Sequence, residues 1–321
     1  MATERILITG ANGQIGSVLT QALRERYGTD HVVASDIRQP AEAAGPFFTL
    51  DVLDGEAMAA LIKRESITQV YHLAAILSAK GEEAPLHTWE INMQGLFNVL
   101  EVARTHQLHK VFYPSSIAVF GSRTEKLLTP QWAHLYPETV YGISKAAGEY
   151  WALYYHTRYG LDVRSVRYPG IIGYQSLPGG GTTDYAVDIF HKAIEGQTFS
   201  CFLKATTALP MLYMDDAIRG TLELMEAPAS KLTVRSSYNL AGMSFTPAEL
   251  AASIQEFIPA FSISYQPDFR QQIADSWPAS IDDSEARADW GWEPSFDLRA
   301  MTKDMLHHLR QRRSASDTAA L

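Results

Sequence analysis

The sequence predicts an α/β fold in which a doubly wound parallel sheet is followed by a smaller C-terminal α/β lobe. In the first half of the 321 residues, short apolar and β-branched runs alternate with longer segments whose apolar residues recur every three or four positions. This alternation is typical of parallel strands joined by helices that cover both faces of a sheet. Beyond Gly170 the alternation becomes irregular, which indicates a second lobe built on a different plan.

The elements of the first half follow one another in a regular order. Strands are expected at residues 5–9, 31–35, 47–50, 69–73, 110–113 and 162–168. Helices are expected between them at residues 13–26, 55–64 and 89–105, and a further helix begins near Thr139. We assign residues 1–170 to the first domain and expect some later segments to return to it.

The second half begins with a loop that contains Pro178 to Gly181, where glycines permit backbone angles that other residues resist. Helices are expected at residues 184–195, 215–225, 247–257 and 298–310, with short strands at 210–214 and 237–240. Residues 171–312 are therefore assigned mainly to the smaller lobe. Residues 313–321 are mostly small and polar, which predicts a mobile tail.

The composition narrows the class of partner. A formal net charge of −9 argues against a polyanion such as nucleic acid and fits a small molecule bound in a local pocket. No apolar run is long enough for a membrane span, and the first predicted strand starts too early to leave room for a signal peptide. The single cysteine, Cys201, excludes an intrachain disulfide and favours a reducing, cytoplasmic location; without paired histidines it also predicts no metal site.

A glycine-rich turn follows the first predicted strand and opens the first predicted helix. Gly10, Gly13 and Gly16 are spaced three residues apart, with Gln14 and Ile15 in the same turn. Backbone amides and a helix dipole at this place can receive a pyrophosphate, as in a Rossmann-type dinucleotide site. The commoner fingerprint has its first two glycines only two apart, so the spacing alone leaves open a tight turn without a ligand.

Acidic residues at later strand ends would complete a nucleotide site. Asp36 ends the second predicted strand, where its carboxylate can accept hydrogen bonds from both hydroxyls of a ribose and would repel a 2′-phosphate. This favours NAD over NADP, although Arg38 is close by and a solvated strand end remains an alternative. Asp51 and Val52 follow the third strand and are assigned to the adenine from topology alone.

Tyr141 and Lys145 are four residues apart on one face of a predicted helix. A nearby ammonium favours the ionised form of a phenol, which can then act as a base. The pair follows the fifth strand at the carboxyl edge of the sheet, where Ser115 and Ser116 also lie. A serine hydroxyl there can orient a reacting alcohol, but an exposed helix pair and two turn-forming serines are the alternatives.

Taken together, Gly10, Gly13, Gly16, Asp36, Ser116, Tyr141 and Lys145 resemble the extended short-chain dehydrogenase/reductase family, which includes UDP-galactose epimerases and L-threonine 3-dehydrogenases. Within that family the chain is most similar to the short-chain L-threonine 3-dehydrogenases. The similarity covers nearly the whole chain. Its most diagnostic segments are Tyr113–Gly121, Pro137–Gly142, Arg167–Gly173, Pro178–Ala186, Trp277–Pro278 and Ile281–Ser284.

The resemblance implies a role for each matching residue. Tyr141 would be the catalytic base, Lys145 its partner and Ser116 the orienting hydroxyl. Residues along the cofactor NAD would be Gly10, Gly13, Gln14, Ile15, Gly16, Asp36, Asp51, Val52, Leu73, Ala74, Ala75, Asn92, Ser115, Tyr141, Lys145, Tyr168, Gly170 and Ile171. Residues that hold the substrate would be Ser78, Ser116, Thr139, Tyr141, Thr182, Thr183 and Trp277.

Two of these segments also have a plain structural explanation. Thr182, Thr183 and Asp184 form an ordinary helix N-cap sequence, which physics alone favours over a ligand site, although a helix start also favours a carboxylate. His72 is next to the cofactor segment. For this histidine, a place in the core or at the strand end is as plausible as a contact with the cofactor.

The expected reaction is oxidation of the β-hydroxyl of L-threonine to 2-amino-3-oxobutyrate, with hydride transfer to NAD. The alternatives are a nucleotide-sugar epimerase or dehydratase, which would use the same tyrosine and lysine, and a non-catalytic NAD-binding sensor. A zinc-dependent alcohol dehydrogenase is disfavoured by the cysteine and histidine content. The resemblance also implies a homodimer formed through the helices at residues 89–105 and 139–156.

Overall fold

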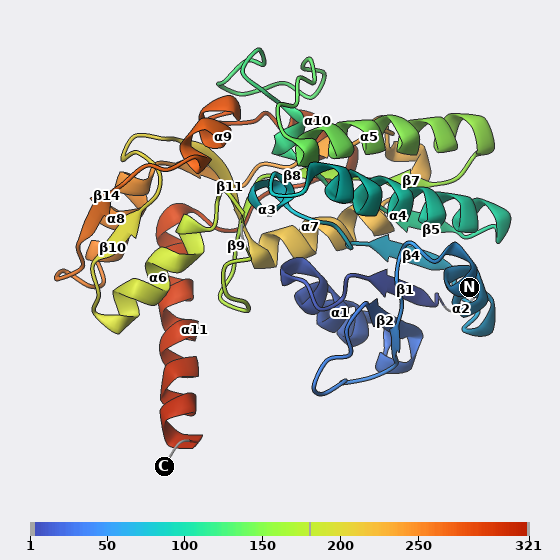
Figure 1. The fold of residues 1–321 in the computed structure, drawn as a ribbon, viewed down its shortest axis with the longest axis horizontal. Coiled ribbons are helices and arrows are strands. Elements are labelled where there is room, and N and C mark those ends of the chain that lie inside the picture. The colour runs from blue at the N-terminus through green and yellow to red at the C-terminus, as the bar shows by residue number, and fades with distance from the viewer. Residues whose placement is uncertain (1–3, 180, 320–321) are drawn as a thin grey trace.

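The protein is described here by a computed structural model that covers residues 4–179 and 181–319. Its centre is a six-stranded parallel sheet in the order β3-β2-β1-β4-β5-β7 (Figure 1). The chain therefore runs outward from β1 in one direction and from β4 in the other, which leaves a crevice at the carboxyl ends where the order reverses. The strands are β1 (Ile6–Thr9), β2 (Val32–Asp36), β3 (Phe47–Thr49), β4 (Gln69–His72), β5 (Lys110–Phe112) and β7 (Val163–Arg164).

Because side chains alternate along each strand, they point to both faces of the sheet. Helices pack against these side chains on both faces. Ile6 and Ile8 of β1 pack with Leu19 of α1 on one face, and Leu7 packs with residues of α2, α4 and α5 on the other. The first face is also covered by α7, which returns from the second half of the chain. The helices are α1 (Gln14–Tyr27), α2 (Gly55–Arg64), α4 (Pro85–Thr105), α5 (Val140–Tyr159) and α7 (Met214–Glu226). The predicted α/β fold class is confirmed.

A second lobe lies beside the carboxyl ends of the sheet (Figure 1). It is built on short strands and the helices around them. Its strands are β9 (Gly170–Ile172), β10 (Phe199–Cys201), β11 (Leu209–Tyr213), β13 (Met243–Phe245) and β14 (Ile263–Tyr265), and its helices are α6 (Tyr185–Glu195), α8 (Pro247–Gln255), α9 (Arg270–Ser276) and α11 (Leu298–Ala319). A further small sheet has the order β12 (Tyr238–Asn239), β8 (Val166–Tyr168) and β6 (Ser115–Ser116). The described residues also form the short helices α3 (Ser78–Gly81) and α10 (Ser284–Trp290) and the 3-10 helices η1 (Thr29–His31), η2 (Ile117–Val119) and η3 (Ala229–Lys231).

One predicted strand was wrong. The run at residues 162–168 is two strands, because β7 pairs with β5 in the central sheet while β8 pairs with β6 and β12 in another. The break falls at Ser165, whose hydroxyl is 2.8 Å from that of Ser237. The predicted helix at 89–105 begins earlier, at Pro85, since a proline suits the first turn of a helix.

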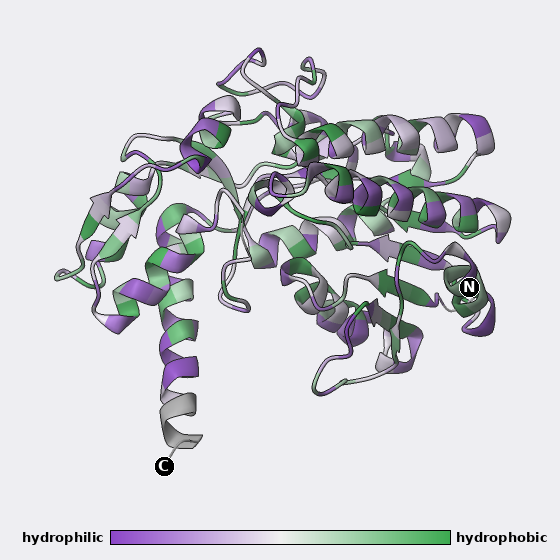
Figure 2. Ribbon diagram, in the orientation of Figure 1, coloured by the Kyte–Doolittle hydropathy of each residue, from purple (hydrophilic) through white to green (hydrophobic). Residues whose placement is uncertain are grey.

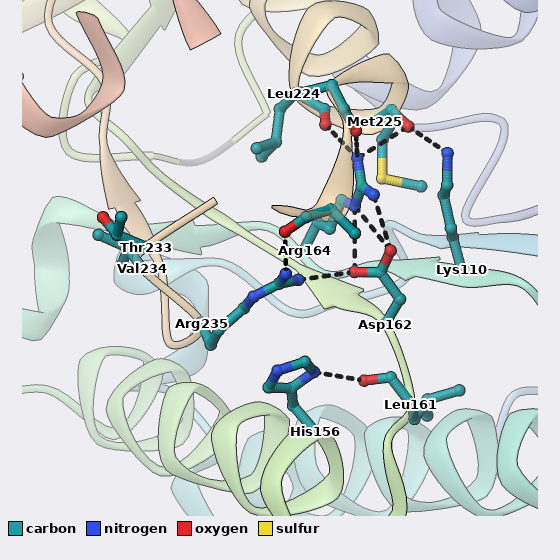
Figure 3. A network of polar contacts seen from close by, with 12 residues as sticks. Lys110, His156, Leu161, Asp162, Arg164, Leu224, Met225, Thr233, Val234 and Arg235 are labelled. Carbon is teal, nitrogen blue, oxygen red and sulfur yellow. Dashed lines mark hydrogen bonds and ion pairs between the residues drawn. The ribbon is translucent and has the colours of Figure 1, made fainter. Parts of the chain in front are cut away.

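A buried polar network holds β7 to the end of α7 (Figure 3). Arg164 donates to the carbonyl oxygens of Leu224 at 2.7 Å and Met225 at 3.1 Å, and pairs with Asp162 at 2.7 Å. Lys110 donates to the same Met225 carbonyl at 2.7 Å. Because the last carbonyls of a helix lack partners within it, these cations stabilise the helix end and fix it to the sheet edge.

The C-terminal helix α11 projects from the second lobe, and its residues 307–313 are mostly hydrophilic (Figures 1 and 2). The predicted tail at 313–321 is therefore helical up to Ala319, and residues 320 and 321 lie outside the described part of the chain. Its mobility stays a prediction. In the loop expected around Pro178 to Gly181, Gly180 also lies outside the described residues.

Candidate active site

The glycine turn joins β1 to α1 at the reversal point of the sheet. Gly10 has a φ of +75°, and a Cβ there would lie 2.6 Å from the backbone nitrogen of Ala74. A Cβ on Gly16 would lie 2.1 Å from the carbonyl oxygen of Gly10. The turn therefore admits no side chain at either position, and it leaves the start of α1 open to a phosphate group.

Asp36 lies beside this turn, at the end of β2. Its carboxylate accepts backbone hydrogen bonds from Asn12 in the turn at 3.1 Å and from Arg38 at 3.4 Å. These contacts hold the carboxylate at the carboxyl edge of the sheet, on the same side as the glycines. The arrangement is the one that a ribose-binding carboxylate needs in a doubly wound fold.

Ser116, Tyr141 and Lys145 meet on the other side of the crevice. Thr139 caps α5 by accepting a hydrogen bond from the backbone of Gly142 at 3.0 Å, which places Tyr141 in the first helical turn and Lys145 one turn later. A Cβ on Gly142 would lie 2.1 Å from the carbonyl oxygen of Ala118, so only glycine lets α5 approach η2 this closely. This approach brings the Tyr141 phenol close to Ser116, whose hydroxyl acts on the phenol and lowers its pKa.

The Lys145 ammonium lies under the Tyr141 ring. Its Nζ donates to the carbonyl oxygen of Pro114 at 2.7 Å and lies 5.6 Å from the Tyr141 ring centroid and 4.6 Å from that of Tyr113. Burial lowers the pKa of Lys145 to about 7. Burial also raises the pKa of Tyr141 to about 12, against the lowering effect of the hydrogen bond with Ser116. Burial thus opposes the ionised phenol that the ammonium is expected to favour, so ionisation of Tyr141 requires further positive charge in the site.

A cavity of about 210 Å³ lies between the glycine turn, the Ser116–Tyr141–Lys145 group and the second lobe. Most of the predicted site residues line it. These are Gly10, Gly13, Gln14, Ile15, Gly16, Leu73, Ala75, Ser78, Ser115, Ser116, Tyr141, Lys145, Tyr168, Gly170, Ile171, Thr182, Thr183 and Trp277.

Two predicted binding residues do not line the cavity and serve the backbone instead. The Asn92 amide accepts from the nitrogen of Ile76 at 2.8 Å and donates to the carbonyl oxygen of Ile76 at 3.1 Å. Thr139 uses its hydroxyl to cap α5, as described above. Asn92 therefore shapes the segment after β4, and Thr139 fixes the start of α5.

Four further predicted cofactor residues also lie off the cavity wall. Asp36 stands beside the glycine turn, and the Ala74 backbone packs against Gly10. Asp51 is exposed and accepts a hydrogen bond from the backbone of Leu53 at 2.9 Å. Val52 is buried in the core behind the sheet. A dinucleotide that extends beyond the cavity can still contact these residues, so their role toward the cofactor stays a prediction.

The second lobe closes the cavity through residues that are distant in sequence. The hydroxyl of Ser78 is 3.3 Å from that of Thr182, 104 residues away. Asp184 is the N-cap residue of α6, and its carboxylate accepts a hydrogen bond from the backbone of Gly181 at 2.8 Å. The sequence pattern indicates only a helix start at Asp184, but this residue also lines the cavity.

The other lining residues that are not in the predicted lists are apolar or glycine: Leu77, Pro114, Ile117, Pro169 and Gly181. Each is next in sequence to an assigned residue, and adjacency is the one signal that could have found them. His72 is a core histidine, hydrogen-bonded to Thr9 at 2.8 Å, and burial lowers its pKa to about 3. It does not line the cavity.

Comparison with known proteins agrees with this geometry. Residues 6–241 match the model of the NAD-dependent epimerase/dehydratase family. The chain belongs to this family. As a member of this NAD-dependent epimerase/dehydratase family it uses NAD as its cofactor, which fits the glycine turn and the carboxylate of Asp36.

Several relatives cover almost the whole chain. An uncharacterized epimerase/dehydratase of Staphylococcus haemolyticus is 48% identical over 314 residues, which are 96% of this chain and 98% of the relative. The holo form of an L-threonine dehydrogenase from Cupriavidus necator is 57% identical, with a TM-score of 0.94 over 95% of this chain and 99% of that one. Its apo form superposes with a TM-score of 0.84 over the same shares. A monomeric L-threonine 3-dehydrogenase of metagenomic origin is 49% identical, with a TM-score of 0.93 over 95% of this chain and 99% of that one.

Among the described residues, no helix combines the length and apolar character that crossing a bilayer requires. The same part of the chain contains no group of three or more histidine, cysteine, aspartate or glutamate side chains placed to hold a metal ion.

Proposed function

We propose that this member of the family is an NAD-dependent L-threonine 3-dehydrogenase that oxidises the β-hydroxyl of L-threonine to 2-amino-3-oxobutyrate. The observation that carries this proposal is the cavity, which has a tyrosine, lysine and serine group on one wall and a carboxylate, Asp184, in the second lobe. A cation and a carboxylate on opposite walls of the cavity suit a small zwitterionic substrate, and the L-threonine dehydrogenase relatives support this choice over a nucleotide-sugar.

The residues present fit NAD on structural grounds. The glycine turn has no room for a Cβ at Gly10 or Gly16, and Asp36 is held beside it. In this proposal the turn holds the pyrophosphate, Asp36 the adenosine ribose, and Tyr168 to Ile171 line the nicotinamide end of the cavity. Bound there, NAD supplies a cationic ring that accepts the hydride leaving the hydroxyl-bearing carbon.

The proton of the β-hydroxyl is transferred by residues of the chain itself. Tyr141 takes the proton of the β-hydroxyl, and Ser116 holds that oxygen beside the phenol. In its ammonium form Lys145 favours the phenolate that burial alone disfavours. The proton thus leaves the substrate oxygen for the phenol oxygen while the lysine keeps the local charge balanced.

The remaining charges of the substrate have partners on the opposite side. Of the cavity-lining residues that the structure describes, Lys145 and Asp184 carry charged side chains. We assign the ammonium group of the substrate to Asp184 and its carboxylate to the hydroxyls of Ser78 and Thr182. Trp277 closes the apolar side, against the methyl group of threonine.

A substrate comparison tests the function. The protein is incubated with NAD and, separately, with L-threonine, L-serine, 3-hydroxybutyrate and UDP-galactose, and NADH formation is followed by absorbance, in the presence of a metal chelator. We expect sustained NADH formation with L-threonine, and at most slow formation with the other compounds. Conversion of UDP-galactose without net NADH would contradict the proposal in favour of an epimerase, and no turnover with any compound would favour an NAD sensor.

We further propose that the protein works in the cytoplasm, in threonine catabolism, as a homodimer. Four exposed apolar side chains of α5 follow helical spacing along one stripe: Ile143, Tyr150, Trp151 and Tyr154. Exposed apolar area of this extent supports a partner surface. Analytical ultracentrifugation of wild type and Tyr150→Glu tests the dimer: we expect a concentration-dependent dimer that the substitution weakens. A wild-type protein that sediments as a monomer at micromolar concentration, like the monomeric relative, would contradict it.

A further inference from the structure

Lys126 holds the chain segment that carries Trp277, although it lies outside the cavity. It belongs to the loop between η2 and α5. Its Nζ donates to the carbonyl oxygens of Asp275 at 3.1 Å, Ser276 at 2.5 Å and Trp277 at 3.1 Å. It also lies 3.4 Å from the carbonyl oxygen of Gly121 in its own loop. One ammonium group therefore binds three successive carbonyls at the end of α9.

The main chain of Lys126 binds the residues that follow Trp277 and Pro278. Its carbonyl oxygen accepts hydrogen bonds from the backbone of Ala279 at 2.8 Å and Ser280 at 3.2 Å. Lys126 thus contacts the chain both before and after the Trp277–Pro278 pair. The backbone contacts do not depend on the side chain, so replacing the ammonium leaves the loop attached.

The ammonium suits this place physically. The last carbonyls of a helix have no partner within it and form the negative end of the helix dipole. Trp277 follows α9 directly, its side chain is 6% exposed, and it lines the cavity. Because the indole extends from the backbone that Lys126 binds, a change of backbone angle at residues 275–277 moves the indole relative to the substrate.

We propose that Lys126 is a positioning residue that sets substrate specificity by holding Trp277 against the apolar side of the substrate. This inference rests on the proposed function. With Trp277 fixed, the cavity accepts the methyl group of threonine and excludes larger groups on the hydroxyl-bearing carbon. With Trp277 released, the cavity accepts larger 3-hydroxy amino acids at the expense of threonine.

The test compares Lys126→Met with wild type on L-threonine and on 3-phenylserine. We expect the KM for L-threonine to rise about tenfold, as for the loss of hydrogen bonds from a charged group. We expect kcat to stay within about twofold and the preference for threonine, as a ratio of kcat/KM values, to fall at least about fivefold. Binding of NAD, measured by calorimetry without substrate, is expected to be unchanged. Lys126→Arg keeps a cation with several donors and is expected to restore part of the preference.

Lys204→Met is the matched control. Lys204 lies 3.6 Å from the side-chain carboxylate of Asp275, which belongs to α9. The Lys204 side chain is 59% exposed. It binds none of the three carbonyls in the described structure. We expect this variant to keep the wild-type preference. An equal loss of preference in both lysine variants would overturn the inference.

Trp277→Ala separates the inference from the function on which it rests. If this variant keeps the wild-type KM and preference, Trp277 does not contact the substrate, and that part of the proposed function fails. If Trp277→Ala shifts the preference and Lys126→Met does not, only the role of Lys126 is overturned. A lower melting temperature for Lys126→Met with an unchanged preference would show a purely structural role and would also overturn it.

Discussion

The two walls of the cavity are built by different means. The wall on the NAD side is backbone packed against backbone: Gly10 against Ala74, and Gly16 against Gly10. The wall on the substrate side is held by side chains that reach across the chain, as Ser78 does to Thr182 and Lys126 to Trp277. The first wall is fixed by steric exclusion, which a single methyl group violates. The second depends on hydrogen bonds that a substitution removes one at a time, so it is the wall on which specificity can change without loss of the fold.

The largest effect is expected where the two walls meet, at Tyr141. Tyr141→Phe removes the phenolate oxygen that accepts the substrate proton and keeps the ring, so kcat should fall by about 10²–10⁴-fold. Binding of NAD should stay as in wild type, because Phe fills the same space. NADH formation and calorimetric NAD titration measure the two quantities. Tyr265→Phe, on β14 and away from the cavity, is the control. Retention of more than about a tenth of wild-type turnover in Tyr141→Phe would refute its role as the base.

The next effect is expected on the NAD wall alone. Gly16→Ala places a Cβ 2.1 Å from the carbonyl oxygen of Gly10, so α1 and the turn must move apart. We expect NAD affinity to fall by at least about tenfold and the free energy of unfolding to fall by about 1–3 kcal/mol, as for other overpacked sites. Calorimetry and urea denaturation measure these. Gly179→Ala is the control, since its Cβ meets no described atom within 4 Å. Wild-type NAD affinity in Gly16→Ala would show that the turn does not hold the cofactor.

The same difference between the walls explains what could be predicted from the sequence. The glycine turn and the tyrosine–lysine pair are local patterns, and their spacing alone fixes a turn or one face of a helix. Thr139 shows the limit of such patterns: resemblance implies a substrate contact, which stays a prediction, and its role as the cap of α5 appears only in the structure. The strand at 162–168 was predicted as one because a β-branched run does not show that its two halves pair in different sheets.

The residues of the substrate wall could be predicted only from the resemblance to the family. Nothing in the local sequence links Ser78 to Thr182, because that contact depends on how the second lobe folds back on the first. Asp184 was seen as a helix start, which it is, while its place on the cavity wall is a tertiary fact. Lys126 has no sequence signal at all, since its partners are backbone carbonyls about 150 residues away, between positions 275 and 277.

Lys145 allows a further test, because its burial makes the stability of the fold depend on pH. Burial lowers its pKa from an ordinary value of 10.5 to about 7. Between pH 7 and 10.5 the unfolded chain therefore holds a proton that the folded chain releases, so stability from this group rises with pH across that window. Below pH 7 both states hold the proton, and the folded state bears the full cost of a buried charge.

Lys145→Met should therefore be more stable than wild type below pH 7, and this gain should shrink as the pH approaches 10.5. The loss of the hydrogen bond to Pro114 adds an offset to this difference, so its slope with pH, and not its absolute size, is the readout. Melting temperatures of both proteins without added NAD, from pH 6 to 10, measure it. A difference that is flat across this range would mean that Lys145 is not buried as a charged group.

The smallest effect is expected on the substrate wall, from Ser78→Ala. A hydrogen bond to a charged group contributes about 1.5–3 kcal/mol, and Thr182 still holds the carboxylate, so the KM for L-threonine should rise at the lower end of that range, by about 10-fold, with kcat and NAD affinity unchanged. Ser122→Ala, whose exposed hydroxyl binds Glu138 away from the cavity, is the control. Because the Ser78 and Thr182 hydroxyls are 3.3 Å apart, their losses should couple: Ser78→Ala combined with Thr182→Val should raise KM by less than the product of the two single effects. Strictly multiplicative effects would mean that the two hydroxyls act on the substrate independently, and that this wall is less connected than the structure indicates.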